Sequence, residues 1–325
     1  MDHLVSLSGG NALGAFLAGA VQEMTARGIA PRHVAGTSIG AITAALWMGG
    51  PPDQAVDRLT AFWQRAADKT GAGHSSAWRK GAVARALMLG RPELFRHRFP
   101  GLMSVFPGAM PDDHVFDTAP LHRFLAELVD LDHLNASPTR VSVVALDQAT
   151  GESVVFDNHH GGLRIDHILA SASLPLAFPP VRLGGRHLVD AGLSENCPVR
   201  RLFDPAPTAP AHCWVIDPWP RQAPLAHSLD EVLGRTQDLA FGCQRDWALR
   251  DVAHRLAAPD APQVALHEII HDEQAWEIGA KAFDYAPAAV ERRWSAGRLR
   301  MAQALDAADG ALGGASTAST GTAPG

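Results

Sequence analysis

The chain has few cysteines, no long apolar run and no sign of a targeting segment at its start. Its 325 residues include three cysteines, which show no metal-binding spacing and leave one odd thiol, so we expect a reducing compartment: Cys197, Cys213 and Cys243. Residues 1–5 carry no basic cluster, and no uninterrupted apolar stretch reaches the roughly 18 residues of a membrane span. The sequence therefore predicts a cytoplasmic protein that meets a membrane, if at all, from its surface.

Neither sign of charge dominates. The 28 basic and 34 acidic residues give a net charge of -6, which argues against nucleic acid as the main partner. Apolar residues make up 46% of the chain and charged residues 19%, as in a globular protein with a sizeable core.

What the chain does have is a repeated order of short apolar strand, turn and helix near its start. Residues 3–8 and 33–36 read as buried strands, and residues 14–27 and 39–48 show helical apolar spacing. This order predicts a three-layer α/β fold, with a central and mostly parallel sheet flanked by helices. Further strands are expected at 141–145, 153–156, 181–183, 187–189 and 213–216, and further helices at 165–173, 228–257 and 287–308.

Residues 53–125 read as a mostly helical, cap-like insertion. Within it, residues 74–110 form a basic and apolar island in an otherwise acidic chain. One interpretation is a cap that contacts an anionic substrate with apolar chains or a membrane surface. The other is an ordinary solvated basic face. The basic residues of the island are Arg79, Lys80, Arg85, Arg91, Arg96 and Arg98.

We expect residues 1–205 to form the main domain, with residues 206–310 as a C-terminal extension packed on it. The stretch 311–325 consists mainly of Gly, Ala, Ser and Thr and has almost nothing to bury, so we expect it to be disordered.

The segment Gly36-Thr37-Ser38-Ile39-Gly40 follows a predicted strand and precedes a predicted helix. A serine on such a turn is an exposed nucleophile, and the turn is tight enough to need glycine two residues before and two after it. The pattern also arises by chance in a chain with this much glycine and serine, but the strand-turn-helix context favours the elbow.

The segment Gly9-Gly10-Asn11 follows the first predicted strand. Adjacent glycines leave backbone N–H groups bare, so this turn is a candidate oxyanion hole. A dinucleotide fingerprint is the competing interpretation, but it needs glycine where Asn11 stands and an acidic residue at the end of the second strand.

A serine nucleophile needs a base. Asp190 ends a predicted strand and is followed by two small residues, so it is our candidate, with a turn or capping aspartate as the plain alternative. Among 16 histidines, His271 has the chain order of a Ser–Asp–His triad. Asp157 and the adjacent His159 and His160 are a poor metal-ligand set, because neighbouring side chains on a strand point to opposite faces. No metal or organic cofactor is expected.

Three ordered blocks make the chain resemble the patatin-like phospholipases, a family of Ser–Asp dyad lipid acyl hydrolases. They are residues 7–16 (LSGGNALGAF), residues 36–41 (GTSIGA), and residues 170–199, which include ASASLP, FPP and VDAGLSENCPV. Residues 279–285 and 292–294 resemble a C-terminal extension found in one bacterial branch of the family.

The resemblance implies Ser38 as nucleophile, Asp190 as its direct base, and the N–H groups of Gly9, Gly10 and Asn11 as the oxyanion hole. The chain departs from the family pattern at Asn11, where a third glycine is usual, and at Leu13, where a cation is common.

We expect a lipid acyl hydrolase of the phospholipase A, lysophospholipase or esterase type. The alternatives are a decayed binding module with the same fold, and a polyester or thioester hydrolase that uses the same dyad. The sequence does not fix the substrate head group, the chain length or the oligomeric state.

Overall fold

The computed structural model describes residues 1–68, 75–259 and 261–317, with side chains up to residue 310. Its centre is an eight-stranded sheet in the order β11-β10-β1-β2-β6-β9-β8, with β7 paired to β6. Neighbours from β11 to β6 are parallel, and β7, β8 and β9 are antiparallel to their partners. The strands are β1 (Asp2–Leu7), β2 (His33–Thr37), β6 (Arg140–Asp147), β7 (Ser153–Asp157), β8 (Val181–Leu183), β9 (Arg186–Asp190), β10 (Ala211–Asp217) and β11 (Val264–Ile270).

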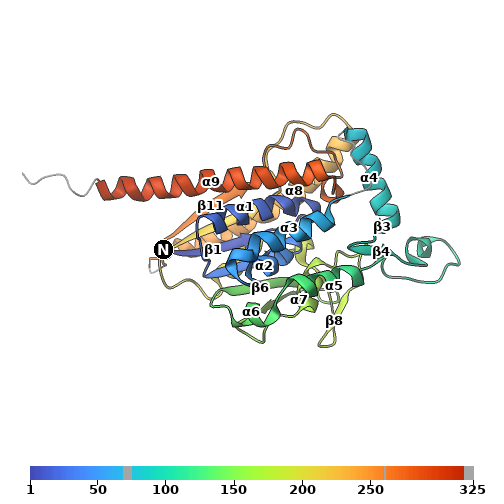
Figure 1. Ribbon diagram of the computed structural model, residues 1–325, viewed down its shortest axis with the longest axis horizontal. Coiled ribbons are helices and arrows are strands. Elements are labelled where there is room, and N and C mark those ends of the chain that lie inside the picture. Colours follow the sequence, from blue (N-terminus) through green and yellow to red (C-terminus); the bar gives the residue numbers. More distant parts are fainter. Residues whose placement is uncertain (69–74, 260, 318–325) are drawn as a thin grey trace, which may run out of the picture.

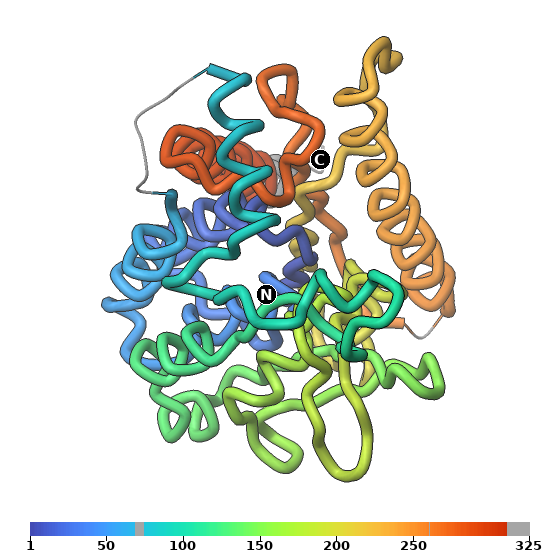
Figure 2. Tube along the Cα trace, turned by 90° about the vertical axis from the view of Figure 1, so that its right-hand side faces the viewer, coloured from blue at the N-terminus to red at the C-terminus, as the bar shows by residue number. Residues whose placement is uncertain are grey.

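Helices cover both faces of the sheet (Figures 1 and 2). The larger apolar core lies under one group of helices: α1 (Gly14–Ala26), α2 (Ile39–Met48), α3 (Ala55–Ala66), α5 (Ala119–Leu128), α6 (Leu131–Ala136), α7 (Ile165–Ala172) and α9 (Pro287–Thr317). A second core lies on the opposite face, under α8 (Leu229–Leu256) and the 3₁₀ segment η5 (Pro198–Phe203). Strands β2 and β10 are buried along their whole length, as expected for parallel strands covered on both faces. The predicted three-layer, mostly parallel fold is confirmed.

The insertion is less helical than predicted. Helices α3 and α5 belong to the main core, and α4 (Ser76–Leu89) leads into a small antiparallel sheet. This sheet has the order β3 (Gly90–Arg91), β4 (Phe95–His97) and β5 (Phe116–Asp117). Seven glycines and prolines interrupt any helical pattern between residues 90 and 111, which explains the difference: Gly90, Pro92, Pro100, Gly101, Pro107, Gly108 and Pro111. His74, at the start of the predicted island, lies outside the described residues.

The predicted C-terminal extension is part of the same sheet. Strand β10 pairs with β1, and β11, which the sequence did not predict, pairs with β10. Helix α9 lies along α1 so closely that a Cβ placed on Gly19 would be 1.9 Å from the carbonyl oxygen of Trp294. A Cβ on Gly297 would be 1.9 Å from the carbonyl oxygen of Phe16. The boundary expected near residue 205 therefore separates no independent sheet or core.

Helix α9 continues to Thr317 and so enters the stretch 311–325 that we expected to be disordered. Residues 318–325 lie outside the described residues. None of the described helices combines the length and the apolar content that a bilayer span requires.

Candidate active site

Strand β6 brings the ends of two other strands together. Thr37, the last residue of β2, pairs with Val144, and Asp190, the last residue of β9, pairs with Ala145. Strand β7 pairs with one edge of β6, and both β2 and β9 pair with the other edge. Because β2 runs parallel and β9 antiparallel to β6, the last residues of β2 and β9 meet along that edge. Ser38, which follows Thr37, is thereby placed beside Asp190.

Ser38 occupies a strained turn between β2 and α2. Its φ of 57° and ψ of -125° are rare for a residue with a side chain. A Cβ on Gly40 would lie 2.0 Å from the carbonyl oxygen of Leu7, and a Cβ on Gly36 would lie 2.5 Å from that of Gly40. Both flanking positions of the predicted elbow therefore require glycine.

The Ser38 hydroxyl donates a hydrogen bond of 2.5 Å to Oδ2 of Asp190. The other carboxylate oxygen of Asp190 accepts from the N–H of Gly192 at 2.7 Å. Ser171, on α7, accepts from the N–H of Ser38 at 2.9 Å, and the carbonyl of Ser173 accepts from the N–H of Asp190 at 2.9 Å. Helix α7 and the residue after it thus hold both members of the pair through their backbone.

Burial raises the pKa of Asp190 from 3.8 to about 6, against the opposing effects of the hydrogen bonds from Ser38 and Gly192. The side chain is almost fully shielded from solvent, so the charged form loses its hydration. A carboxylate with this pKa is still mostly ionised at pH 7, and it is a better proton acceptor than an ordinary aspartate.

The glycine-rich turn lies against the serine, since a Cβ on Gly9 would be 3.1 Å from the Cβ of Ser38. The N–H of Gly9, which we expected to serve the oxyanion, donates to the carbonyl of Asn196 at 3.0 Å and so already has an acceptor. Within the described residues, the N–H groups of Gly10 and Asn11 have no acceptor. Asn11 has a φ of 51°, a conformation that asparagine tolerates better than most residues.

Leu13 stands where a cation was expected from the family pattern. It is fully buried and packs with Trp219 and Ala282 in a small apolar cluster. This position is therefore part of the core and makes no contact with solvent.

The alternative base lies in a different environment. His271 stacks on the ring of Phe16 at 5.1 Å between centroids, and its Nε2 lies 3.6 Å from Oε1 of Glu277. Both oxygens of Asp190 have other partners, so the geometry favours a dyad over a triad that includes His271.

The groups considered as metal ligands already have protein partners. The carboxylate of Asp157 accepts from Arg140 at 2.7 Å and from His160 at 3.0 Å. Among the described residues, the insertion also brings together Asp112, Asp113 and His114. Asp112 accepts there from the N–H of Gly101 at 3.0 Å, and it lies 3.3 Å from Arg98. Neither group lies at the Ser38–Asp190 pair.

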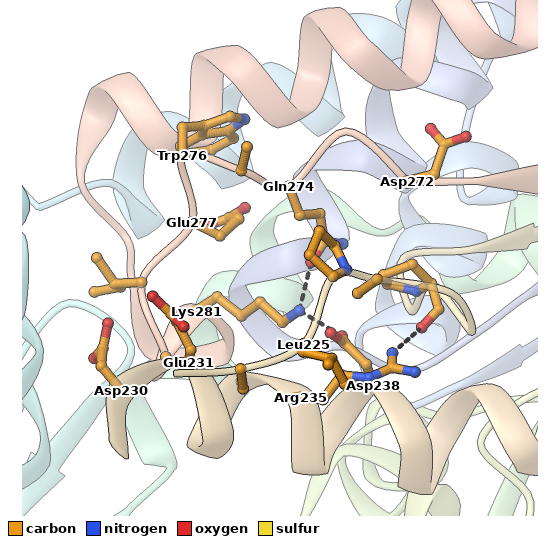
Figure 3. Close-up of a pocket in the computed structure, with 18 of the residues that line it drawn as sticks. Leu225, Asp230, Glu231, Arg235, Asp238, Asp272, Gln274, Trp276, Glu277 and Lys281 are labelled. Carbon is orange, nitrogen blue, oxygen red and sulfur yellow. Dashed lines mark hydrogen bonds and ion pairs between the residues drawn. The ribbon is translucent and has the colours of Figure 1, made fainter. Parts of the chain in front are cut away.

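A cavity of about 850 Å³ lies between the start of α8 and the segment that follows β11 (Figure 3). Lys281 extends into it and contacts both Asp238 and Gln274. Neither Ser38 nor Asp190 lines this cavity, so it is separate from the dyad.

Four residues around the site were missed by sequence reasoning. Ser171 lies within a block that matched the family pattern, and this was the only available signal for it. Asn196 lies in that same block and Tyr285 in the segment 279–285 that resembles a C-terminal extension, whereas no pattern marked Trp219. Asn196 and Trp219 donate to the carbonyl of Gly9, and Tyr285 donates to the side chain of Asn11.

Comparison with known proteins gives one family match. The family model described as patatin-like phospholipase matches residues 5–203. No curated protein matches the chain in sequence.

Solved structures show weak similarity. VipD from Legionella pneumophila is 15% identical, with 94% of this chain and 67% of that chain covered and a TM-score of 0.43. The type III effector protein ExoU is 16% identical, with 94% of this chain and 52% of the ExoU chain covered and a TM-score of 0.40. A chain from a complex of SpcU and ExoU from Pseudomonas aeruginosa is 18% identical, with 79% of this chain and 53% of that chain covered and a TM-score of 0.31. The chain thus spans about half the length of the ExoU chains.

Proposed function

This chain belongs to the patatin-like phospholipase family, and we propose that it hydrolyses carboxylic esters of lipids through an acyl-enzyme on Ser38, with Asp190 as general base. The observation that carries the proposal is the 2.5 Å hydrogen bond from the strained Ser38 to the buried Asp190. The neighbouring turn supports it with the N–H groups of Gly10 and Asn11, which have no acceptor in the part of the chain that the structure describes.

The reaction follows from this geometry. Asp190 accepts the hydroxyl proton as Ser38 Oγ attacks the ester carbonyl carbon. The carbonyl oxygen becomes an oxyanion, which the N–H groups of Gly10 and Asn11 and the N-terminus of α2 stabilise. Protonated Asp190 then gives its proton to the leaving alcohol oxygen. Water, deprotonated by the same carboxylate, attacks the acyl carbon, and the proton returns to Ser38 as the acid leaves.

The insertion supports contact with a lipid surface, mainly through apolar side chains. Phe99 is 75% exposed and Phe106 58%. Leu176 is also strongly exposed, and a backbone bridge to His114 joins it to the insertion. Leu176 lies three residues after Ser173, whose carbonyl accepts from the N–H of Asp190. The exposed apolar side chains between residues 88 and 176 define the apolar patch: Met88, Leu89, Phe99, Leu102, Met103, Val105, Phe106, Met110 and Leu176.

The arginines of the island contribute less than the sequence suggested. Several of them are turned toward the protein: Arg79 pairs with buried Asp284, Arg85 with Asp68, and Arg98 with Asp112, while Arg91 lies over the ring of Tyr285. Most of the predicted basic face is therefore paired with acidic side chains, and among the described residues of the island Arg79 forms the buried ion pair. We attribute surface contact to the apolar patch.

Charged substitutions in the apolar patch should separate surface binding from chemistry. We expect Phe99→Asp with Phe106→Asp to lower hydrolysis of phospholipid vesicles about 10-fold or more, because each charge opposes insertion into the interface. Hydrolysis of a soluble p-nitrophenyl ester should stay within about 2-fold. Equal losses on both substrates would contradict a surface role, and Leu225→Asp, at an exposed leucine outside the patch, is the matched control.

The decayed-module alternative loses its sequence support in the structure. Asn11 is bonded to Tyr285, and Leu13 belongs to the core, so both departures have a structural reason. Ser38 and Asp190 are both present and in contact.

A substrate panel tests the function directly. Purified phospholipid, lysophospholipid, acylglycerol, polyester and acyl-thioester substrates are incubated with wild type, Ser38→Ala, Asp190→Asn and the control Ser153→Ala. We expect release of fatty acid from at least one lipid ester by wild type and by the control, and loss of about 10³-fold or more in the two dyad variants. Release of acid only from polyester or thioester would reassign the substrate. An inert wild type, or dyad variants as active as wild type, would overturn the proposal.

A further inference from the structure

The glycine-rich turn is held from behind by side chains that lie outside the region matched by the family model. The indole N–H of Trp219 donates to the carbonyl of Gly9 at 2.7 Å. The hydroxyl of Tyr285 donates to the side-chain oxygen of Asn11. The matched region ends at residue 203, so both donors come from the C-terminal part of the chain.

The bond from Trp219 fixes the direction of an N–H group. The carbonyl of Gly9 and the N–H of Gly10 belong to one planar trans peptide, in which they point in opposite directions. Holding the carbonyl toward Trp219 therefore holds the Gly10 N–H toward the opposite side. Asn196 adds a weaker bond of 3.2 Å to the same carbonyl.

The indole of Trp219 is itself tightly held. The backbone N–H of Trp219 donates to the carboxylate of Asp217 at 2.8 Å. The centroid of the indole lies 4.6 Å from that of the Phe241 ring and 5.6 Å from the ammonium of Lys281. The side chain is almost fully buried. A donor fixed in this way constrains the acceptor that it binds.

Tyr285 holds the side chain of Asn11, the residue that carries the second amide. Asn11 has a positive φ, and its own N–H shares a peptide with the Gly10 carbonyl, which accepts from Leu13 at 3.0 Å. Burial raises the pKa of Tyr285 to about 12, so the hydroxyl stays protonated and donates. This tyrosine is the only one in the chain, and its ring lies between Trp63 and the guanidinium of Arg91.

We propose that Trp219 and Tyr285 are positioning residues for the oxyanion site. Trp219 holds the peptide that carries the Gly10 N–H, and Tyr285 holds the side chain of Asn11 and with it the positive-φ residue that carries the second N–H. This inference rests on the proposed ester hydrolysis. It assigns the C-terminal segment a part in the chemistry, although that segment supplies no group to the substrate.

The test uses Trp219→Phe and Tyr285→Phe in the full chain. Each change keeps an aromatic ring and removes one donor. Direct loss of an oxyanion donor costs about 10²–10³-fold in kcat, so a misdirected donor should cost less, about 10-fold in each variant. KM for a soluble ester should stay within about 2-fold, and the pH midpoint of kcat/KM should not move, because Asp190 is untouched.

A transition-state analogue distinguishes positioning from general damage. An alkyl boronic acid forms a tetrahedral anion on the serine, so its affinity should fall in each variant by the same factor as kcat/KM. The matched control is Trp214→Phe, which removes the hydrogen bond from the indole of Trp214 on β10 to His3 on β1. This control should change neither kcat/KM nor the boronate affinity.

The outcomes separate the two claims. If wild type hydrolyses esters, Ser38→Ala is dead, and both Phe variants keep full kcat and full boronate affinity, the positioning role is overturned while the function stands. A fall in kcat with unchanged boronate affinity also overturns it. If wild type is inert on every ester, both claims fail. Should Trp219→Phe not fold, Tyr285→Phe decides alone.

Discussion

At the scale of single residues, the proposed chemistry depends on a carboxyl group with altered proton affinity. Asp190 is buried against Ser38, and burial raises its pKa to about 6. The proposed mechanism uses no histidine between them, because the carboxylate accepts a hydrogen bond from the hydroxyl directly.

The pH dependence of activity should report this group. Only the ionised carboxylate accepts a proton, so kcat/KM should fall as the pH drops through about 6 and reach a plateau above pH 7. The measurement is kcat/KM for a soluble ester between pH 4 and pH 9. A midpoint near 4, the value of an ordinary aspartate, would contradict a buried base.

The same group lowers stability at high pH. The pKa of Asp190 in the folded state exceeds the unfolded value of 3.8, so its contribution to the free energy of unfolding is fully present below pH 3.8. This contribution is lost as the pH rises through about 6. Asp190→Asn removes that charge and should gain up to about 3 kcal/mol in unfolding free energy at pH 8, and little at pH 4. Urea unfolding of both proteins at the two pH values checks this. A variant less stable than wild type at pH 8 would contradict it.

At the scale of elements, the elbow depends on the contact between β1 and α2. Gly40→Ala should destabilise the protein by about 1–3 kcal/mol and abolish activity, because the new methyl group collides with the carbonyl of Leu7. The control is Gly81→Ala on α4, where an added Cβ meets nothing within 4 Å and the helix should be slightly stabilised. Thermal unfolding and ester hydrolysis of both variants test it. Normal activity in Gly40→Ala would show that the turn can open.

Local patterns predicted the elements that carry the dyad. The elbow at Ser38 and the strand ending at Asp190 each depend on a few neighbouring residues. That β6 pairs with both strands was not predicted, because strand order depends on contacts between distant segments. The use of the Gly9 amide by Asn196 was not predictable, because that bond joins residues 187 positions apart, a separation that no short pattern encodes. The buried ion pair of Arg79 was missed for the same reason, since its partner Asp284 lies 205 positions away.

At the scale of the whole molecule, the sheet cannot be divided at residue 205. Strand β10 pairs with β1 along six residues, and α9 covers α1. A chain ending at residue 205 should expose an edge of β1 and the apolar side of α1, and should lose cooperative unfolding and all activity. Circular dichroism during heating tests this against a chain ending at residue 310. A shorter chain that melts cooperatively and hydrolyses esters would contradict a single folding unit.

The most direct measurement of the dyad is the mass of the intact protein after reaction with an alkyl fluorophosphonate at pH 8. We expect one adduct on wild type, located at Ser38 by peptide mapping, and no adduct on Ser38→Ala or Asp190→Asn. A label at another residue, or full labelling of Asp190→Asn, would contradict a serine activated by this carboxylate.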